Sequence, residues 1–350
     1  MSHRACILGC QGQALTADER AFFRDVRPWG FILFARNIQG ADQVRALTDA
    51  LRRAVDDADT LVFVDQEGGR VQRLRPPLAV LREPAGRFGD LYLRDPESAV
   101  EAVFLNHRLM AEELSALGID ADCAPSLDLR HPGANAVIGD RAFGDRPITV
   151  AALGRAAVDG LMAGGVAPVI KHMPGHGRAR ADSHLETPVV DAPLDVLEAT
   201  DFEPFRALAD TPMGMTAHVA FSAVDADACV TVSRHAIGTL IRGLIGFDGL
   251  LMSDDLSMKA LGGDLHDRAR RAVAAGCDLA LHGNGALVGE PARDLLAELG
   301  AVASACPELS GRPAERAEAA RQSARRRQPF DRDGAIARLS ALGLGGRIAA

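Results

Sequence analysis

The stretch Val166-Ala-Pro-Val-Ile170, followed directly by Lys171-His-Met-Pro-Gly-His-Gly177, decides the fold of this chain. Its first part is a short apolar run of the kind that forms a buried strand. Its second part carries a lysine and two histidines, and ionisable groups at a strand end are costly to desolvate unless they belong to a site. The glycines and the proline favour a loop. The stretch therefore predicts a strand whose carboxyl end carries functional groups.

The same pattern recurs along the chain. Short apolar runs predict eight strands, at Cys6–Leu8, Gly30–Phe34, Leu61–Val64, Ile119–Ala124, Val166–Ile170, Met213–Ala217, Leu250–Met252 and Leu279–Leu281. Apolar residues at helical spacing predict helices between them, at Ala41–Asp57, Glu97–Leu117, Thr149–Ala163, Val196–Leu208, Ile237–Ile245 and His266–Ala275. Strands that alternate with helices indicate a parallel sheet of the α/β class.

Polar residues follow almost every predicted strand, and this pattern distinguishes between two kinds of parallel sheet. These residues are Arg36-Asn37, Asp65-Gln66-Glu67, Asp128, Lys171-His172, His218, Asp254-Asp255 and His282. Groups from so many strand ends converge if the strands form a ring, whose carboxyl-terminal face carries the site. A doubly wound sheet is the alternative, but no Gly-x-Gly-x-x-Gly turn follows an early strand. We expect a TIM-like (β/α)8 barrel in a single catalytic domain over residues 1–290.

The region after residue 290 reads differently. Helical patterns near Pro291–Ala305 and Pro313–Arg327 are followed by a tail, so we expect residues 291–350 to form C-terminal helices packed on the barrel. The second pattern is rich in arginine. An outer helix facing solvent is the favoured interpretation, and a surface for an anionic partner is the alternative.

The bulk composition excludes several classes of protein. A net charge of −8 argues against general nucleic-acid binding. No apolar run reaches the roughly 18–20 residues of a membrane span, and the N-terminus lacks the apolar segment of a signal peptide. The six cysteines are scattered, which indicates reduced thiols. These features favour a cytoplasmic enzyme, and we expect a monomer.

Lysine usage points back to the deciding stretch. Nearly all basic residues are arginines, and the lysines are Lys171 and Lys259. A lysine at the end of a buried strand in such a chain indicates a need for a compact ammonium group there.

Three further groups of residues carry chemistry. The paired carboxylates Asp254 and Asp255 follow a buried strand, where an aspartate serves as nucleophile, metal ligand or helix cap. The segment from Asp65 to Arg73 suits a polyhydroxylated ligand, although an internal Glu–Arg pair at a Gly-Gly turn is the alternative. In the segment from Asp182 to His184, the aspartate orients the imidazole and raises its basicity.

Three more residues stay ambiguous when they are considered alone. Arg141 follows a loop and could simply lie on the surface, while His218 and His282 could be hydrogen-bonded inside the barrel.

Together these segments resemble glycoside hydrolase family three, and in particular its single-domain bacterial branch, the β-N-acetylglucosaminidases of peptidoglycan recycling. The resemblance is carried by Phe31-Ile-Leu-Phe-Ala-Arg-Asn37, Val64-Asp-Gln-Glu-Gly-Gly-Arg-Val-Gln-Arg73, Ile138-Gly-Asp-Arg141, Lys171-His-Met-Pro-Gly-His-Gly177 with Asp182-Ser-His184, Met215-Thr-Ala-His-Val219, Gly249-Leu-Leu-Met-Ser-Asp-Asp-Leu-Ser-Met258 and Ala275-Gly-Cys-Asp278. The Lys-His-x-Pro-Gly-His-Gly pattern with its Asp-Ser-His continuation is specific to this branch.

The resemblance implies a role for each matching residue. Asp254 is the implied nucleophile of a retaining mechanism, and His184 is the implied general acid/base with Asp182 as its partner. The implied ligands of the N-acetylglucosamine unit are Asp65, Arg73, Arg141, Lys171 and His172. A terminal non-reducing N-acetylglucosamine of a muropeptide is the implied substrate, with no cofactor and no metal.

This chain departs from the family pattern at four positions. These are Met173 after the Lys-His pair, Arg178 and Arg180 in the loop, and His282, where relatives usually carry a small or apolar residue. The departures bear on the aglycone and the pH optimum more than on the reaction type.

Four alternatives remain open. His172, His176, His184, His218, Asp254 and Asp255 could supply the site of a metal-dependent barrel hydrolase. Because a histidine acid/base does not repel an anion, phosphate could replace water, and Arg178 and Arg180 favour that β-N-acetylglucosaminide phosphorylase. A non-catalytic sugar-binding barrel and a β-glucosidase complete the set.

Overall fold

Eight parallel strands form the centre of the molecule. The computed structural model describes residues 2–180, 187–285, 294–324 and 327–347. Its main sheet has the order β11-β9-β7-β6-β3-β2-β1-β12. The strands are β1 (Arg4–Leu8), β2 (Pro28–Leu33), β3 (Leu61–Val64), β6 (Ala121–Asp122), β7 (Ala167–Met173), β9 (Met213–Thr216), β11 (Leu250–Met252) and β12 (Ala280–His282).

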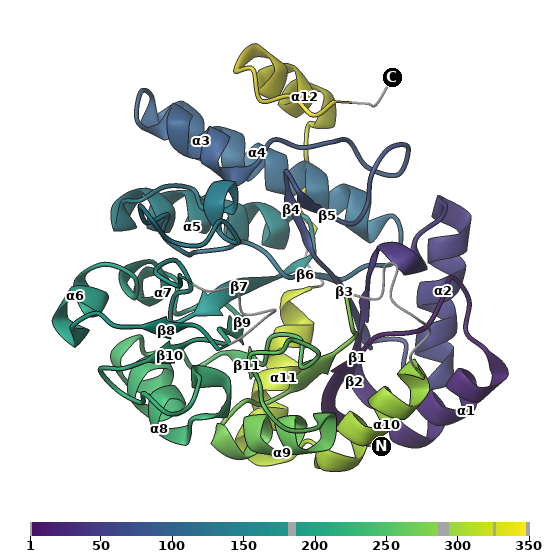
Figure 1. Ribbon diagram of the computed structural model, residues 1–350. Coiled ribbons are helices and arrows are strands. Elements are labelled where there is room, and N and C mark those ends of the chain that lie inside the picture. Colours follow the sequence, from purple (N-terminus) through teal and green to yellow (C-terminus); the bar gives the residue numbers. More distant parts are fainter. Residues whose placement is uncertain (1, 181–186, 286–293, 325–326, 348–350) are drawn as a thin grey trace.

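The sheet closes on itself between its two outer strands. Met252 of β11 and Leu279, just before β12, form a parallel bridge, and the Ser253 amide donates a 3.0 Å hydrogen bond to the Leu279 carbonyl. The strands therefore form a ring surrounded by helices (Figure 1). The predicted (β/α)8 barrel is confirmed, and each of the eight predicted strands overlaps one strand of the ring.

β2 and β3 are apolar along their length because both faces of the sheet are covered. β2 and β3 consist entirely of buried residues, as expected for parallel strands with side chains inside the barrel and helices outside. The outer layer includes α2 (Ala41–Ala54), α4 (Pro96–Ser115), α5 (Pro147–Ala163), α9 (Leu265–Ala275) and α10 (Leu295–Ala305). Their predicted positions were correct to within a few residues; for the helix predicted near Pro291–Ala305, residues 291–293 lie outside the described residues and α10 begins at Leu295.

Two predicted helices have a different structure. The single helix predicted over Val196–Leu208 is wrong, because α6 (Leu194–Ala199) and α7 (Glu203–Ala207) are separated by residues 200–202, which include Thr200 and Asp201. Both of these side chains form hydrogen bonds at the break. Ile237–Leu244 forms a π-helical segment, η4, after the short α8 (Arg234–Ala236).

Several elements were not predicted. α1 (Ala17–Val26) begins with a reciprocal capping box between Thr16 and Glu19, a signal that is visible in the sequence. The others are α3 (Ala85–Tyr92), the hairpin of β4 (Gln66–Gly68) and β5 (Val71–Gln72), the parallel pair β8 (Val189–Val190) and β10 (Ala220–Phe221), and the 3₁₀ turns η1 (Ala35–Asn37), η2 (Gly139–Arg141) and η3 (Val230–Val232). α12 (Arg332–Ala341) forms within the stretch expected as a tail and packs on α4, where Arg338 pairs with Glu101 at 2.8 Å.

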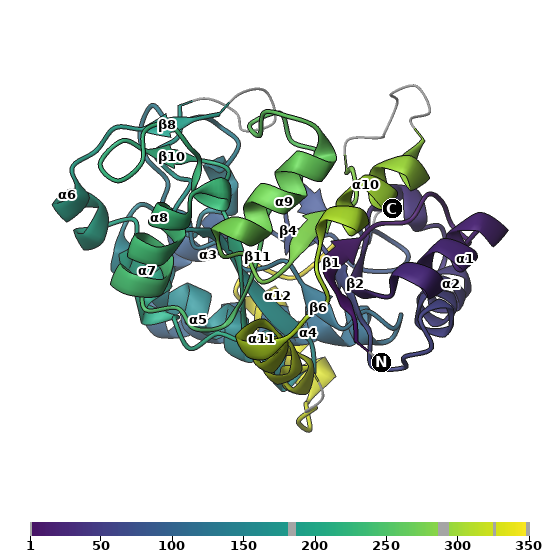
Figure 2. The same ribbon diagram turned by 90° about the horizontal axis from the view of Figure 1, so that it is seen from below.

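The arginine-rich helix α11 (Gly311–Ser323) lies across the amino-terminal end of the barrel. Arg316 pairs with Asp278, which precedes β12, at 3.0 Å, and with Asp248, which precedes β11, at 2.6 Å. Arg321 pairs with Asp57, ahead of β3, at 3.0 Å. Figure 2 shows α11 at the end of the barrel opposite to β8 and β10. These arginines hold the helix on the barrel, so their charge is used inside the molecule.

Among the described helices, none combines the length and the apolar character that a membrane span needs. All six cysteines are buried free thiols.

Candidate active site

A chain of ion pairs lies at the carboxyl-terminal end of the barrel. Lys171, near the end of β7, is buried, and its Nζ lies 2.9 Å from Oδ1 of Asp65 and 2.8 Å from Oε1 of Glu67. Both carboxylates follow β3, so the two strand ends are tied together by one ammonium group. The compact charge predicted for Lys171 thus reaches two acceptors at once.

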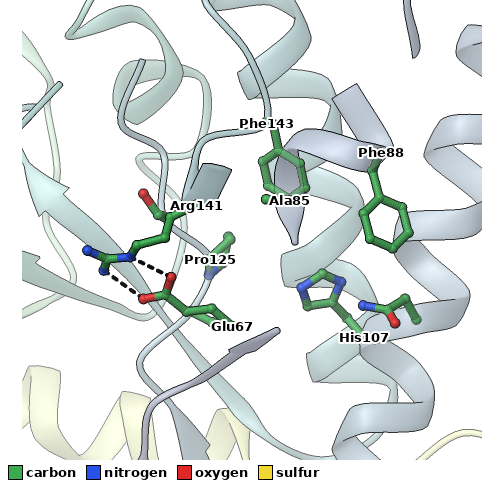
Figure 3. A pocket seen from close by; sticks show the side chains of 10 residues that line it. Glu67, Ala85, Phe88, His107, Pro125, Arg141 and Phe143 are labelled. Atoms are coloured by element: carbon green, nitrogen blue, oxygen red, sulfur yellow. Dashed lines mark hydrogen bonds and ion pairs between the residues drawn. The ribbon is translucent and has the colours of Figure 1, made fainter. Parts of the chain in front are cut away.

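Two arginines extend this chain. Arg141, in η2, makes a bidentate pair with Glu67 through Nε and Nη2, both at 2.8 Å (Figure 3). Arg73, just after β5, donates to Oδ2 of Asp65 at 3.1 Å. Figure 3 also shows a small pocket beyond the Arg141–Glu67 pair, where Phe88, His107 and Phe143 contribute to the lining.

The contacts test the internal Glu–Arg pair that was the alternative for the segment from Asp65 to Arg73. Asp65 pairs with Arg73 inside the segment, whereas Glu67 pairs with Arg141, which lies 74 residues away. The internal Glu–Arg pair is therefore wrong: Asp65 forms the internal pair, and Glu67 binds Arg141 and Lys171 outside the segment.

The ion pairs keep the whole network charged. Burial on its own would raise the pKa of Asp65, but Lys171 and Arg73 lower it to about 2. Burial likewise opposes the charge on Glu67, and Arg141 and Lys171 hold its pKa well below the usual value. The pKa of Lys171 is raised despite burial, because Asp65 and Glu67 favour the ammonium form. Fixed charges of both signs present strong donors and acceptors to a ligand with several hydroxyl groups.

His172 is held by a carboxylate that was not among the predicted site residues. Nδ1 of His172 lies 2.6 Å from Oδ2 of Asp128, and Nη2 of Arg141 approaches Nε2 at 3.5 Å. A ring that donates from Nδ1 and accepts at Nε2 has a defined tautomer. Asp128 is fully buried and also accepts from the His176 amide at 2.6 Å. It thus fixes the start of the loop after β7.

Gly177 is needed in that loop because of a close approach of two backbone segments. A Cβ atom at this position would lie 2.0 Å from the Leu129 carbonyl oxygen. The glycine that follows His176 therefore lets the loop pack against the chain that carries Asp128.

Asp254 lies in the loop after β11. Its Oδ1 accepts a 2.7 Å hydrogen bond from the Asp255 amide. Burial lowers the pKa of His176 to about 4 and also lowers that of His218, and the Asp254 carboxylate opposes the shift in both. Asp254 is therefore within electrostatic reach of the residues around β7 and β9.

The two ambiguous histidines are both hydrogen-bonded inside the barrel. His218 bonds through Nδ1 to Oγ1 of Thr231 at 2.8 Å and through Nε2 to the Asp255 carbonyl at 3.1 Å. The ring nitrogens of His282 lie 3.4 Å from an Asp255 carboxylate oxygen and 3.2 Å from Oε2 of Glu298. Both rings thus support the loop that carries Asp254.

Asp182 and His184 lie outside the described residues. The chain before them is anchored by Arg178, whose Nε donates to Oδ2 of Asp201 at 2.6 Å. The other oxygen of this buried carboxylate pairs with His131 at 2.8 Å. The charge of Arg178, expected as a possible attraction for phosphate, is thus balanced by a neighbouring aspartate.

The structure brings five of the predicted site residues into one connected network, namely Asp65, Arg73, Arg141, Lys171 and His172. Glu67 and Asp128 complete the network, and the sequence signal for both was their position after a predicted strand. In the described part of the chain, no three His, Cys, Asp or Glu side chains are grouped as metal ligands.

Comparison with known proteins adds the family. The model of the glycosyl hydrolase family 3 N-terminal domain matches residues 11–305. The chain belongs to this family. A β-hexosaminidase of Alkalilimnicola ehrlichii is 45% identical to this family 3 chain over 282 residues, which are 79% of either protein. One of Aromatoleum aromaticum is 40% identical over 79% of this chain and 78% of its own length.

A solved structure covers nearly the whole family 3 chain. NagZ from Neisseria gonorrhoeae, in complex with N-trifluoroacetyl-D-glucosamine, superposes with a TM-score of 0.81 at 32% identity. The match spans 98% of this chain and 95% of that protein. The likeness thus includes the C-terminal helices as well as the barrel.

Proposed function

We propose that this family 3 protein is a retaining exo-β-N-acetylglucosaminidase that removes terminal non-reducing N-acetylglucosamine from muropeptides of the N-acetylglucosaminyl-1,6-anhydro-N-acetylmuramic acid type. The carrying observation is the charged network of Asp65, Glu67, Lys171 and Arg141 at the end of the barrel that also holds Asp254. The activity is supported by the β-hexosaminidase relatives and by the N-acylated glucosamine bound to a structural neighbour.

In this proposal the network binds the sugar and Asp254 attacks it. Asp65, Arg73, Arg141, Lys171 and His172 hold hydroxyl and acetamido groups, which keeps the anomeric carbon in place. Asp254 attacks that carbon, the bond to the leaving oxygen breaks, and a glycosyl-enzyme forms. The Asp255 amide donates to Asp254 at 2.7 Å and so orients the carboxylate that attacks.

Asp182 and His184 supply the proton transfers in this proposal. Protonated His184 donates to the leaving oxygen, and the neutral ring then takes a proton from the water that releases N-acetylglucosamine. Asp182 orients the ring. His184→Ala should therefore slow substrates with poor leaving groups far more than substrates with good ones, and equal losses on both would contradict this role.

The proposed partner is a small carbohydrate, with a cytoplasmic site of action and a monomeric enzyme. A cytoplasmic site fits a substrate released from the cell wall and taken up for recycling. No nucleic acid or membrane takes part in the proposed reaction.

The deciding experiment compares 4-nitrophenyl N-acetyl-β-glucosaminide with the matching β-glucoside, for wild type and for Asp254→Asn. We expect turnover of the N-acetyl substrate alone, and its loss in Asp254→Asn. Turnover of the glucoside at a similar rate would favour a β-glucosidase. Activity that survives Asp254→Asn would remove Asp254 from its role as nucleophile.

A further inference from the structure

A buried ionic cluster lies behind the loop that carries Asp254. His282, the last residue of β12, is fully buried. Its ring lies between two carboxylates, with Nδ1 3.4 Å from Oδ1 of Asp255 and Nε2 3.2 Å from Oε2 of Glu298. Nε2 forms a hydrogen bond with Glu298, whereas Nδ1 lies within ion-pair distance of Asp255 without hydrogen-bond geometry. Because both partners are acceptors, only an imidazolium ion presents a proton to each of them.

The surroundings favour this charged form. Burial lowers the pKa of His282, but Asp255 and Glu298 raise it to about 9. Arg36 of η1 donates to the carbonyls of Gly283 and Asn284, immediately after His282. Among the described residues, the titratable and charged groups around the cluster include Asp255, Glu298, Arg36, Glu19 and Cys10. Burial raises the pKa of the Cys10 thiol to about 12, so it stays neutral.

The cluster is joined to the nucleophile through Asp255. Besides facing His282, the Asp255 carboxylate accepts from the Ser257 amide at 2.9 Å and from the Gly285 amide at 3.3 Å. The amide of the same residue donates to Asp254 at 2.7 Å. The direction of that amide therefore depends on how the Asp255 side chain is held.

We propose that His282 is a positioning residue for the nucleophile, because its cationic ring holds Asp255 so that the Asp255 amide stays directed at the Asp254 carboxylate. This inference rests on the proposed attack by Asp254. Loss of the proton from His282 leaves two buried carboxylates facing a neutral ring. The loop then relaxes, and Asp254 loses the donor that orients it.

The test measures kcat/KM against pH, from about pH 6 to about pH 10, for wild type, His282→Gln and Glu298→Gln. The substrate is 2,4-dinitrophenyl N-acetyl-β-glucosaminide, whose good leaving group makes glycosylation independent of the general acid. An alkaline decrease in kcat/KM on this substrate then reports a group other than His184. Lys171 does not interfere because its pKa is raised above that of a free lysine.

We expect the wild-type kcat/KM to fall with a pKa of about 9, in line with the environment of His282. His282→Gln should lower kcat/KM about tenfold or more, mainly through kcat, and remove the alkaline decrease. Glu298→Gln should keep kcat/KM within about threefold at pH 6 but move the alkaline decrease to lower pH, because one carboxylate no longer supports the imidazolium ion.

A matched control is His3→Gln at the opposite end of the barrel, where His3 pairs with Asp57 at 2.8 Å. It removes a histidine–carboxylate pair without touching the Asp254 loop, so its profile should match wild type. Wild-type turnover together with an unchanged alkaline decrease in Glu298→Gln would overturn the inference, even where His282→Gln does not fold. A wild type without turnover of the N-acetyl substrate would instead overturn the proposed function.

Discussion

Nζ of Lys171 lies 2.8 Å from Oε1 of Glu67, and Nη2 of Arg141 donates to the same oxygen at 2.8 Å. One buried carboxylate thus holds two cations that come from different parts of the chain. Because the second oxygen of Glu67 accepts from Nε of Arg141 at 2.8 Å, the carboxylate also sets the plane of the guanidinium group. Glu67 is therefore the residue that joins the end of β3 to η2 and β7.

Glu67→Gln is expected to lower both stability and activity. An amide in place of the carboxylate leaves two buried cations short of negative charge, and breaking a buried pair costs about 3–5 kcal/mol. Thermal unfolding and kcat/KM on the N-acetyl substrate measure the two effects, and kcat/KM should fall at least about tenfold.

The same variant should change the response to acid. The pKa values of Glu67 and Asp65 are lowered in the folded protein, so their stabilisation is present above the unfolded values of about 4 and is lost as the pH falls towards the folded values. As the pH falls, the free energy of unfolding of Glu67→Gln should therefore decrease less steeply than that of wild type. The control is Glu198→Gln, whose partner Arg206 is 3.9 Å away at the surface, and which should cost less than about 1 kcal/mol. Equal losses in both variants would contradict the prediction.

The free energy of unfolding of Asp122→Asn, relative to that of wild type, should increase as the pH rises. Burial raises the pKa of Asp122 well above its usual value, and its Oδ2 has no hydrogen-bond partner among the described residues. Because the pKa of Asp122 is higher in the folded protein than in the unfolded chain, its stabilising contribution is complete below the unfolded pKa of about 4. That contribution is lost as the pH rises through the folded pKa. Urea unfolding of wild type and variant at about pH 5 and about pH 8 measures this difference. A difference that does not change with pH would show that Asp122 ionises as readily in the folded state as in the unfolded one.

Activity should survive a chelator. A metal binds the lone pair of an unprotonated nitrogen, but Nδ1 of His172 is engaged by Asp128 and both ring nitrogens of His218 are hydrogen-bonded. We expect kcat to be unchanged after dialysis against EDTA. The contrary result is a loss of activity on dialysis that added Zn²⁺ restores. That result would favour the metal-dependent barrel hydrolase.

Phosphate should not replace water as the acceptor of the sugar. Arg178 is paired with Asp201 and also donates to Thr200 at 3.1 Å, so its charge is balanced within the protein. The product in phosphate buffer should therefore be free N-acetylglucosamine, for wild type and for Arg178→Gln alike. Formation of the sugar 1-phosphate, detected by phosphorus NMR, would establish the phosphorylase instead.

Arg316→Ala should destabilise the fold more than Arg312→Ala. The Arg316 side chain is largely buried and pairs with the buried Asp278 at 3.0 Å, whereas the pairs of Arg312 with Asp248 and Glu315 are exposed. Losing Arg316 leaves Asp278 with the Arg242 guanidinium and the Leu251 amide, at a cost of about 1–3 kcal/mol. Exposed pairs contribute about 0–1 kcal/mol. Denaturant unfolding distinguishes the two variants, and equal losses would mean that α11 is not anchored through Arg316.

Much of the barrel could be predicted because its signals are local. An apolar run such as Leu61–Val64 forms a strand in any ring that covers both of its faces, and a polar residue directly after it lies at the same rim. The single helix predicted over Val196–Leu208 was wrong because hydrophobic spacing does not register a local break. Asp201 is needed there by His131 and Arg178, which are far away in the sequence.

The sequence by itself determined the class of fold and the rim residues, since strand length, helical spacing and the Lys171–His172 pair are written in neighbouring positions. Only the tertiary structure decided which charges meet. Glu67 lies 74 residues from Arg141, and Asp128 lies 44 residues from His172, so their pairing exists only after the ring has closed. The position of α11 across the end of the barrel likewise depends on pairings between residues that are distant in the sequence. A hydrogen-bonded ion pair needs its atoms within about 4 Å, and chain closure rather than local sequence brings these groups that close.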